Sequence, residues 1–221
     1  MLKRFILPAI FVIIAALLYR YIIFVPGQYV DQIMFLSIIL CFAFGLLNTR
    51  KDNFLRTLAL ACTVGADYYL VYCTPRQELN GMLFFLAVQT FYAAYLFVSG
   101  RKKLWLFVRV GLVAAIEVVT YIVLGSKMDP LAAVSVAYYA IMLVNILEAF
   151  TQIKKDILFP IGLLLFVLCD SVIGLQVAAK GYLPIPADSA LYQLIFSNFN
   201  LPWLFYLPSQ VLIALSQRKR R

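Results

Sequence analysis

The sequence predicts an all-α membrane protein, formed by a bundle of about eight transmembrane helices in a single domain. Hydrophobic residues make up 64% of the 221-residue chain, and the mean hydropathy is +0.93. Only 13% of the residues are charged, roughly half the share that a soluble domain carries. Apolar runs of about 20 residues, long enough to cross the hydrocarbon core of a bilayer, follow one another along the chain.

Eight apolar runs account for almost the whole length, so we expect one integral membrane domain over residues 1–221 and no separate soluble domain. The expected helices are roughly 5–24, 30–48, 54–73, 81–99, 104–124, 130–150, 157–178 and 197–216. Turn residues mark the breaks, namely Pro26-Gly27, Thr74-Pro75, Asn80-Gly81, Ser99-Gly100, the stretch from Gly125 to Pro130 and the stretch from Gly181 to Pro186.

Basic residues fall mainly on one side of the predicted membrane. If the helices alternate in direction, 15 of the 19 Lys and Arg residues lie on the side that also holds both termini, while Arg76, Lys127 and Lys180 lie opposite. The positive-inside rule makes the richer side cytoplasmic. The net charge of +9 therefore predicts orientation and contact with the bilayer. It does not predict nucleic-acid binding, because the basic residues form short clusters between apolar runs.

Four carboxylic acids lie inside the apolar runs, where a charge costs about 2.5–3.5 kcal/mol on insertion scales, so each is a functional candidate. Asp67, Glu117 and Asp170 each lie 13 residues after the first residue of an outward-running helix. At about 1.5 Å per residue they reach one depth, roughly 20 Å above the cytoplasmic end. Glu148 lies near an inner helix end, and we expect it to be an interfacial charge that reaches water or Lys154 and Lys155.

Polar and aromatic neighbours favour a shared cavity around these acids. Thr63 lies one turn below Asp67, and Ser171 adjoins Asp170. Further candidates to line a substrate site are Gln89, at a depth comparable to that of the acids, Tyr92 and Tyr139, deep in their helices, and Asn145, near the inner helix end beside Glu148. The competing interpretation of the acids is purely structural hydrogen bonding between helices.

The chain contains no histidine. This absence argues against the three-histidine zinc site of some membrane hydrolases and against a Ser-His-Asp triad. A catalytic site in this chain must use carboxyl, hydroxyl and amide groups. We therefore expect no metal site and no cofactor.

Several segments resemble the YhhN-type lysoplasmalogenase family, whose members are eight-helix membrane proteins. Gly162–Ser171 is similar to the family's Gly-rich apolar run that ends in Ser-Asp-Ser, with Cys169 in place of the first serine. Thr63–Leu70 is similar to its apolar segment that ends in Gly-Asp, with Ala66 in place of the glycine. In these two matches, Asp67 and Asp170 correspond to the aspartates of the two family motifs.

Two further segments continue the resemblance in the same order along the chain. Val88–Tyr92 resembles the family's Ala-His-x-x-Tyr stretch, with Gln89 in place of the histidine. Tyr206–Leu215 resembles its Tyr-x-x-Ala-Gln motif followed by Leu-Ile-Ala-Leu, with Ser209 and Gln210 as the matching pair. Tyr206 and Gln210 join the candidate substrate-binding residues on this basis.

The resemblance implies hydrolysis of the vinyl-ether bond of a lysoplasmalogen, which releases a fatty aldehyde and a glycerophospho-base. Protonation of the β-carbon of a vinyl ether produces an oxocarbenium-like cation that water then attacks. This reaction requires one protonated carboxyl group and one ionised carboxylate, and two neighbouring acids in a low-dielectric site share a proton in this way. We expect Asp67 and Asp170 to be this catalytic pair, and the sequence leaves open which of them donates the proton.

Two other functions are compatible with the same residues. Intramembrane carboxylates also serve as proton relays in proton-coupled transporters. A non-catalytic lipid-binding relative would keep the same scaffold, and the Ala66 and Gln89 departures suit it. In each case we expect a multi-pass protein in contact with the lipid bilayer, and in the cytoplasmic membrane if the source is bacterial. If the protein is the enzyme, we expect its substrate to be a lysophospholipid.

Overall fold

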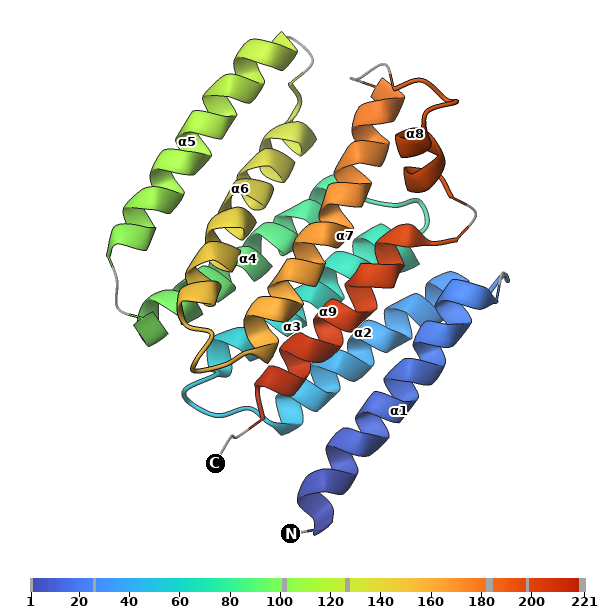
Figure 1. Ribbon diagram of the computed structural model, residues 1–221, viewed down its shortest axis with the longest axis vertical. Coiled ribbons are helices and arrows are strands. Elements are labelled where there is room, and N and C mark those ends of the chain that lie inside the picture. The colour runs from blue at the N-terminus through green and yellow to red at the C-terminus, as the bar shows by residue number, and fades with distance from the viewer. Residues whose placement is uncertain are drawn as a thin grey trace.

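The computed structural model describes residues 2–25, 27–100, 103–125, 128–181, 185–197 and 199–218. Lys127 and the basic residues at positions 101, 102 and 219–221, which contribute to the predicted orientation, lie outside these ranges. The described part of the chain folds into nine α-helices and one short π-helix (Figure 1). They are α1 (Leu2–Phe24), α2 (Val30–Leu47), α3 (Phe54–Asp67), η1 (Tyr68–Tyr72), α4 (Glu78–Gly100), α5 (Leu104–Leu124), α6 (Pro130–Thr151), α7 (Leu158–Gly181), α8 (Ala190–Ile195) and α9 (Leu201–Ser216).

The predicted all-helical membrane fold is confirmed. Among the described residues, seven helical segments are long and apolar enough to cross a membrane, with α3 and η1 together forming one of them. Helix α9 is equally apolar but has only 16 residues. The assignment of the terminus-bearing side to the cytoplasm stays a prediction.

Besides α4, which begins at Glu78 so that the predicted break at Asn80-Gly81 lies inside the helix, the structure departs from the predicted helix boundaries at two places. The last helix begins at Leu201 instead of 197, because Pro202 occupies its first turn, where a missing backbone N–H costs nothing. The separate short helix α8 precedes it, capped by the Ser189 hydroxyl, which accepts a hydrogen bond from the Tyr192 backbone nitrogen at 3.2 Å. The second departure is η1, which interrupts the predicted helix 54–73 directly after Asp67.

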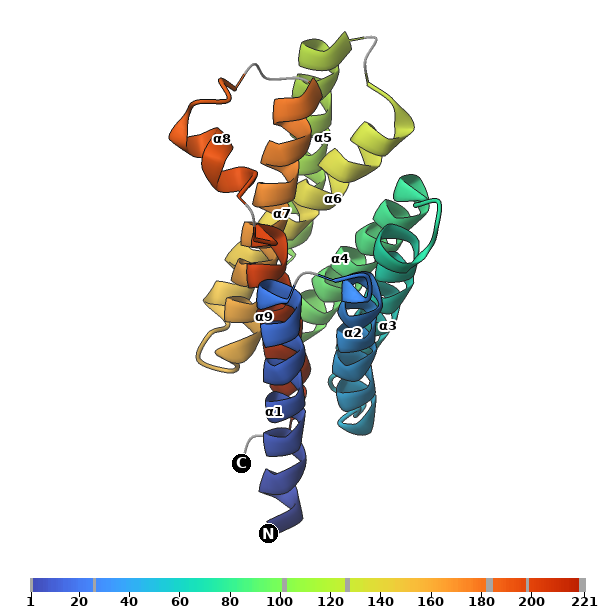
Figure 2. The ribbon, with the colours of Figure 1, turned by 90° about the vertical axis from the view of Figure 1, so that its right-hand side faces the viewer.

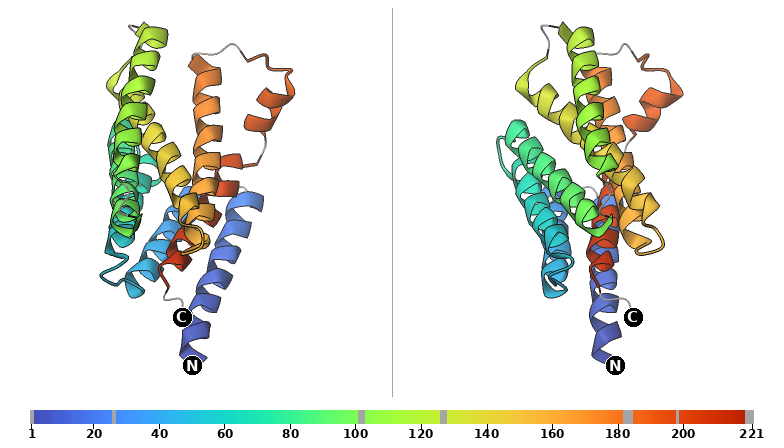
Figure 3. Two further views of the ribbon diagram at one scale, coloured as in Figure 1. Left: turned by 60° about the vertical axis from the view of Figure 1, so that its left-hand side comes forward. Right: turned by 90° about the vertical axis from the view of Figure 1, so that its left-hand side faces the viewer.

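Helix α9 lies in the middle of the bundle and packs against α7, α2 and α1, while α3 and α4 form a hairpin that joins α6 through α4. Figure 2 shows α2, α3 and α4 side by side, with α9 next to them. Helix α5 lies at the periphery against α6 (Figure 3). Both chain ends lie at the same end of the bundle (Figure 1), where the Arg218 guanidinium lies 5.6 Å from the centre of the Phe5 ring.

Side-chain contacts set the register of α9 against its neighbours. At the terminus-bearing end, Arg56 of α3 donates to the Ser216 hydroxyl at 2.9 Å, and Thr57 donates to the Gln217 side-chain oxygen at 2.8 Å. On α7, a Cβ at Gly162 would lie 2.7 Å from the Ile213 Cγ1 atom, so glycine allows the two helices to approach closely. Further along α3 and α7, Asp67 and Phe166 both contact Tyr206, which precedes Ile213 and Ser216 on α9, so both helices run antiparallel to α9.

Candidate active site

Asp67 is the last residue of α3 and is buried, with 2% of its surface exposed. The Tyr206 hydroxyl of α9 donates a hydrogen bond of 2.7 Å to the Asp67 Oδ2 atom. Directly after Asp67 the backbone changes from an α-helix to the single π-helical turn η1, in which the Cys73 nitrogen donates to the Tyr68 carbonyl. Isolated π turns inside helices are frequently found at functional sites, and this one carries no side-chain candidate of its own.

Asp170 lies on α7 and is half-buried. The Tyr138 hydroxyl of α6 donates a hydrogen bond to its Oδ2 atom. One residue further along both helices, the hydroxyl groups of Tyr139 and Ser171 lie 2.7 Å apart and share a hydrogen bond. Two successive pairs of side chains therefore join α6 to α7 at the level of Asp170.

Tyr138 is not among the residues predicted from the sequence, which selects the neighbouring Tyr139. A signal for it was present, because Tyr138 lies seven residues before the candidate Asn145 and so occupies the same face of its helix. Fourteen tyrosines in an apolar chain conceal such a residue, since most of them serve packing or interfacial roles.

A cluster of aromatic rings connects the two tyrosine–aspartate pairs. The Phe85 ring of α4 lies 5.8 Å from the Tyr138 ring and 6.3 Å from the Tyr206 ring, measured between centroids. Phe166 of α7 contacts both Phe85 and Tyr206, at 5.7 and 5.6 Å. The tyrosine that bonds Asp67 and the tyrosine that bonds Asp170 therefore contact one aromatic cluster, to which α4, α6, α7 and α9 contribute rings.

Gln89 and Asn145 belong to a second polar network beside this cluster. The Asn145 side-chain nitrogen donates to both the side-chain and the backbone oxygen of Gln89, each at 2.9 Å. Arg109 of α5 donates to the Asn145 side-chain oxygen at 3.1 and 3.0 Å, and it forms an ion pair with Glu148. Gln89, Asn145 and Glu148 are almost completely buried.

The expected interfacial position of Glu148 was therefore wrong. Its exposed fraction is 1%, because Arg109 reaches it from the adjacent helix and compensates its charge inside the protein. Lys155, one of the expected partners, instead donates to the Ser99 carbonyl oxygen at 3.0 Å. Arg109 itself is a buried ion-pair partner, although its place near a helix end suggested a basic anchor at the membrane surface.

Glu117, in contrast, is not brought to the aspartate pair. It lies half-buried on α5, a helix that packs against α6, and no hydrogen bond or ion pair involves its carboxyl group among the described residues. Tyr92 and Gln210 are fully buried in the interior of the bundle.

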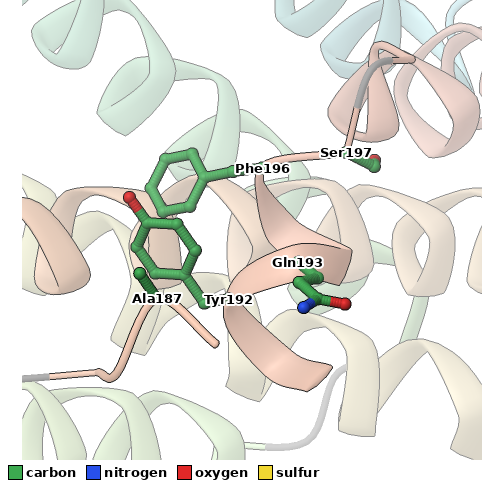
Figure 4. A pocket seen from close by; sticks show the side chains of 5 residues that line it. All are labelled: Ala187, Tyr192, Gln193, Phe196 and Ser197. Carbon is green, nitrogen blue, oxygen red and sulfur yellow. The ribbon is translucent and has the colours of Figure 1, made fainter. Parts of the chain in front are cut away.

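A pocket of about 420 Å³ lies at α8 (Figure 4), at the end of the bundle opposite the termini (Figure 1). It is lined by Ala187, Tyr192, Gln193, Phe196 and Ser197, in and beside α8. The Gln176 side chain of α7 holds this segment through a hydrogen bond to the Ile195 carbonyl oxygen. None of the predicted site residues lines this pocket. Among the described residues, His, Cys, Asp and Glu side chains do not gather into a group of three or more that could hold a metal ion.

Fold and site together define a helical membrane protein with one buried and one half-buried carboxyl group in its bundle, each of which accepts a hydrogen bond from a tyrosine hydroxyl. The YhhN family model matches residues 27–217, from the turn before α2 to the end of α9. The chain therefore belongs to the YhhN family. No curated protein and no solved structure matches the chain.

Proposed function

We propose that this chain is a membrane hydrolase that cleaves the vinyl-ether bond of lysoplasmalogens. The observation that carries the proposal is that Asp67 and Asp170 each accept a hydrogen bond from a tyrosine hydroxyl, and that the rings of both tyrosines contact the Phe85 ring. Membership of the YhhN family, which is associated with hydrolase activity, supports the same class of reaction.

The proposed chemistry follows from the demands of a vinyl ether. The protonated carboxyl group transfers its proton to the alkenyl β-carbon, and the adjacent carbon becomes an oxocarbenium ion. The ionised carboxylate stabilises this cation at short range in a low-dielectric site. Water adds to the cation and loses a proton to that carboxylate. The resulting hemiacetal then collapses to a fatty aldehyde and the glycerophospho-base, so no external oxidant or reductant is required.

The surrounding side chains suit such a cation. The rings of Phe85, Phe166 and Tyr206 contact one another, and the Tyr206 hydroxyl donates to Asp67. Aromatic faces attract a positive charge. They also exclude bulk water, which strengthens the electrostatic interactions inside the cluster. The hydroxyl groups of Tyr139 and Ser171, beside Asp170, are placed to bind a hydroxyl group of the glycerol.

The substrate reaches the pair from the Asp170 side in this proposal. Asp170 is half-buried between α6 and α7, whereas Asp67 is buried. Apolar side chains of α7 near Asp170, such as Leu168 and Ile173, are exposed on the surface. An alkenyl chain dissolved in the bilayer can therefore approach Asp170 along an apolar surface.

The experiment is to follow fatty aldehyde release from lysoplasmenylethanolamine by the detergent-purified protein. We expect activity in the wild type, a loss of at least about two orders of magnitude in Asp67→Asn and in Asp170→Asn, as for a lost general acid or base, and full activity in the matched control Asp31→Asn. Asp31 is an exposed carboxylate that pairs with Arg76 at 3.7 Å.

Three results would contradict the proposal. The first is a folded wild type that releases no aldehyde, and the second is undiminished rates in both aspartate variants. The third is substrate binding without turnover, which would indicate a non-catalytic lipid-binding relative. Proton-driven uptake of a solute into proteoliposomes without product would indicate a transporter.

A further inference from the structure

Three fully buried side chains in the interior of the bundle have polar atoms without a hydrogen-bond partner among the described residues. They are the Gln89 side-chain nitrogen, the Tyr92 hydroxyl and the Gln210 side-chain oxygen. The exposed fraction of all three residues is 0%. Buried polar groups in native proteins are almost always hydrogen-bonded, to protein or to ordered water, so these three atoms indicate a polar ligand inside the bundle.

The helix register brings the three side chains to neighbouring levels. Phe85 of α4 contacts Tyr206 of α9, and these two helices run in the same direction because both are antiparallel to α3. Gln89 and Gln210 each follow four residues later, so both lie about 6 Å, one helical turn, closer to the terminus-bearing end. Tyr92 follows one turn beyond Gln89 on the same face of α4.

Asp67 lies at the other end of this polar region. Since Tyr206 donates to Asp67 and α3 runs antiparallel to α9, Thr63 of α3 comes level with Gln210. Thr63 is fully buried, and its hydroxyl donates to the Ala59 carbonyl oxygen at 3.0 Å, which leaves its lone pairs free to accept. The polar region therefore begins one turn from the Asp67 carboxyl group.

The orientation of both amide groups is set by their other atoms. The Gln89 side-chain oxygen accepts from Asn145, and the Gln210 side-chain nitrogen donates to the Ser209 hydroxyl at 3.2 Å. The atoms left over are consequently a donor on Gln89, an acceptor on Gln210 and a hydroxyl, which can do both, on Tyr92. The N–H donor of Gln89 would repel a bound cation, and the acceptor oxygen of Gln210 would repel a bound anion. Water satisfies all three because it both donates and accepts.

We propose that Gln89, Tyr92 and Gln210 hold bound water on the terminus-bearing side of Asp67, and that this site supplies the nucleophile. The second part rests on the proposed function. In this arrangement the water adds to the oxocarbenium carbon and its proton passes to Asp67, while Asp170, on the side from which the substrate enters, donates the proton to the alkenyl β-carbon. The water site thus distinguishes the roles of the two acids.

The water site can be tested without any catalytic activity by X-ray radiolytic hydroxyl-radical labelling of the purified protein. Radicals form from water where it is bound, so a buried ring is labelled only when water lies next to it. We expect Tyr92 to be labelled severalfold faster than Phe166, an equally buried ring among aromatic neighbours. Equal labelling of the two rings in the wild type would overturn the proposal, and this comparison needs no variant.

Two variants on the same helix sharpen the test. Gln210→Leu removes one of the three polar atoms and is expected to lower Tyr92 labelling severalfold. Ile213→Leu, a buried apolar exchange one turn further along α9, is expected to leave it unchanged. Unaltered labelling in a folded Gln210→Leu protein would overturn the site.

The role of the site is tested separately, by the products formed in methanol–water mixtures. Methanol that attacks the oxocarbenium ion gives a mixed acetal in place of aldehyde. Gln210→Ala enlarges the water site, so we expect a severalfold higher ratio of acetal to aldehyde than in the wild type. An unchanged ratio would overturn the supply of the nucleophile from this site. A wild type without aldehyde release would contradict the proposed function while the labelling result stands.

Discussion

Replacement of Arg109 by leucine is expected to destabilise the bundle strongly, because Arg109 is the partner of a buried carboxylate. Glu148 is 1% exposed and forms its ion pair with Arg109, whose guanidinium also makes two hydrogen bonds of 3.0–3.1 Å to Asn145. Removal of one member of a buried ion pair leaves an uncompensated charge and costs about 3–5 kcal/mol. Arg109 is also the one buried residue in the described part of α5, so the loss should loosen this helix.

The magnitude can be measured as a free energy of unfolding by steric trapping in bicelles, as a double-mutant cycle. We expect Arg109→Leu to lose about 3–5 kcal/mol and the double variant Arg109→Leu with Glu148→Leu to lose clearly less, because apolar side chains replace a buried ion pair with little cost. A loss below about 1 kcal/mol in Arg109→Leu, the value of an exposed ion pair, would refute the reasoning. A double variant with fully additive losses would also refute it.

Other substitutions give further expected outcomes. Tyr138→Phe and Tyr206→Phe each remove a hydrogen bond to a carboxyl group. Such a bond is worth about 1.5–3 kcal/mol when the carboxyl group is charged, so the rate of aldehyde release should fall roughly tenfold to a hundredfold. The control Tyr121→Phe, at an exposed tyrosine, should retain full activity. Gly162→Ala places a Cβ 2.7 Å from Ile213 Cγ1 and 3.0 Å from the Ser209 carbonyl oxygen, and overpacking of this kind costs about 1–3 kcal/mol of unfolding free energy. Gly174→Ala, on the same helix with open space around its Cβ, should be neutral or stabilising by up to about 1 kcal/mol; equal effects at the two glycines would contradict the close packing of α7 on α9.

Much of the fold follows from hydropathy, because a membrane-spanning helix must be long and apolar and the loops must carry turn residues. The sequence did not show the separate helix α8, because its six residues, 190–195, are too few for an apolar membrane span and only the cap at Ser189 marks its start. The π-helical turn after Asp67 has no sequence signal either, since Tyr68–Tyr72 is as apolar as the helix before it.

The candidate site was predictable in its acids but not in their partners. Asp67 and Asp170 stand out because ionisable groups are rare inside a membrane, and depth along the helix places them at one level. Depth says nothing about rotation around the helix axis, however, and Glu117 at the same depth lies on a peripheral helix. Glu148 was misplaced for a related reason, because its partner Arg109 is 39 residues away in the sequence and only the packing of α5 on α6 brings the two together.

The central claim is that one of the paired acids protonates the alkenyl carbon of a lysoplasmalogen. Its most direct test is a single-turnover reaction in D₂O, with the aldehyde reduced to the alcohol as soon as it forms and then analysed by mass spectrometry. We expect the alcohol from the wild type to carry one deuterium on the carbon next to the former carbonyl carbon. We expect no alcohol above background from Asp170→Asn. Product without that deuterium, or equal product from Asp170→Asn, would contradict it.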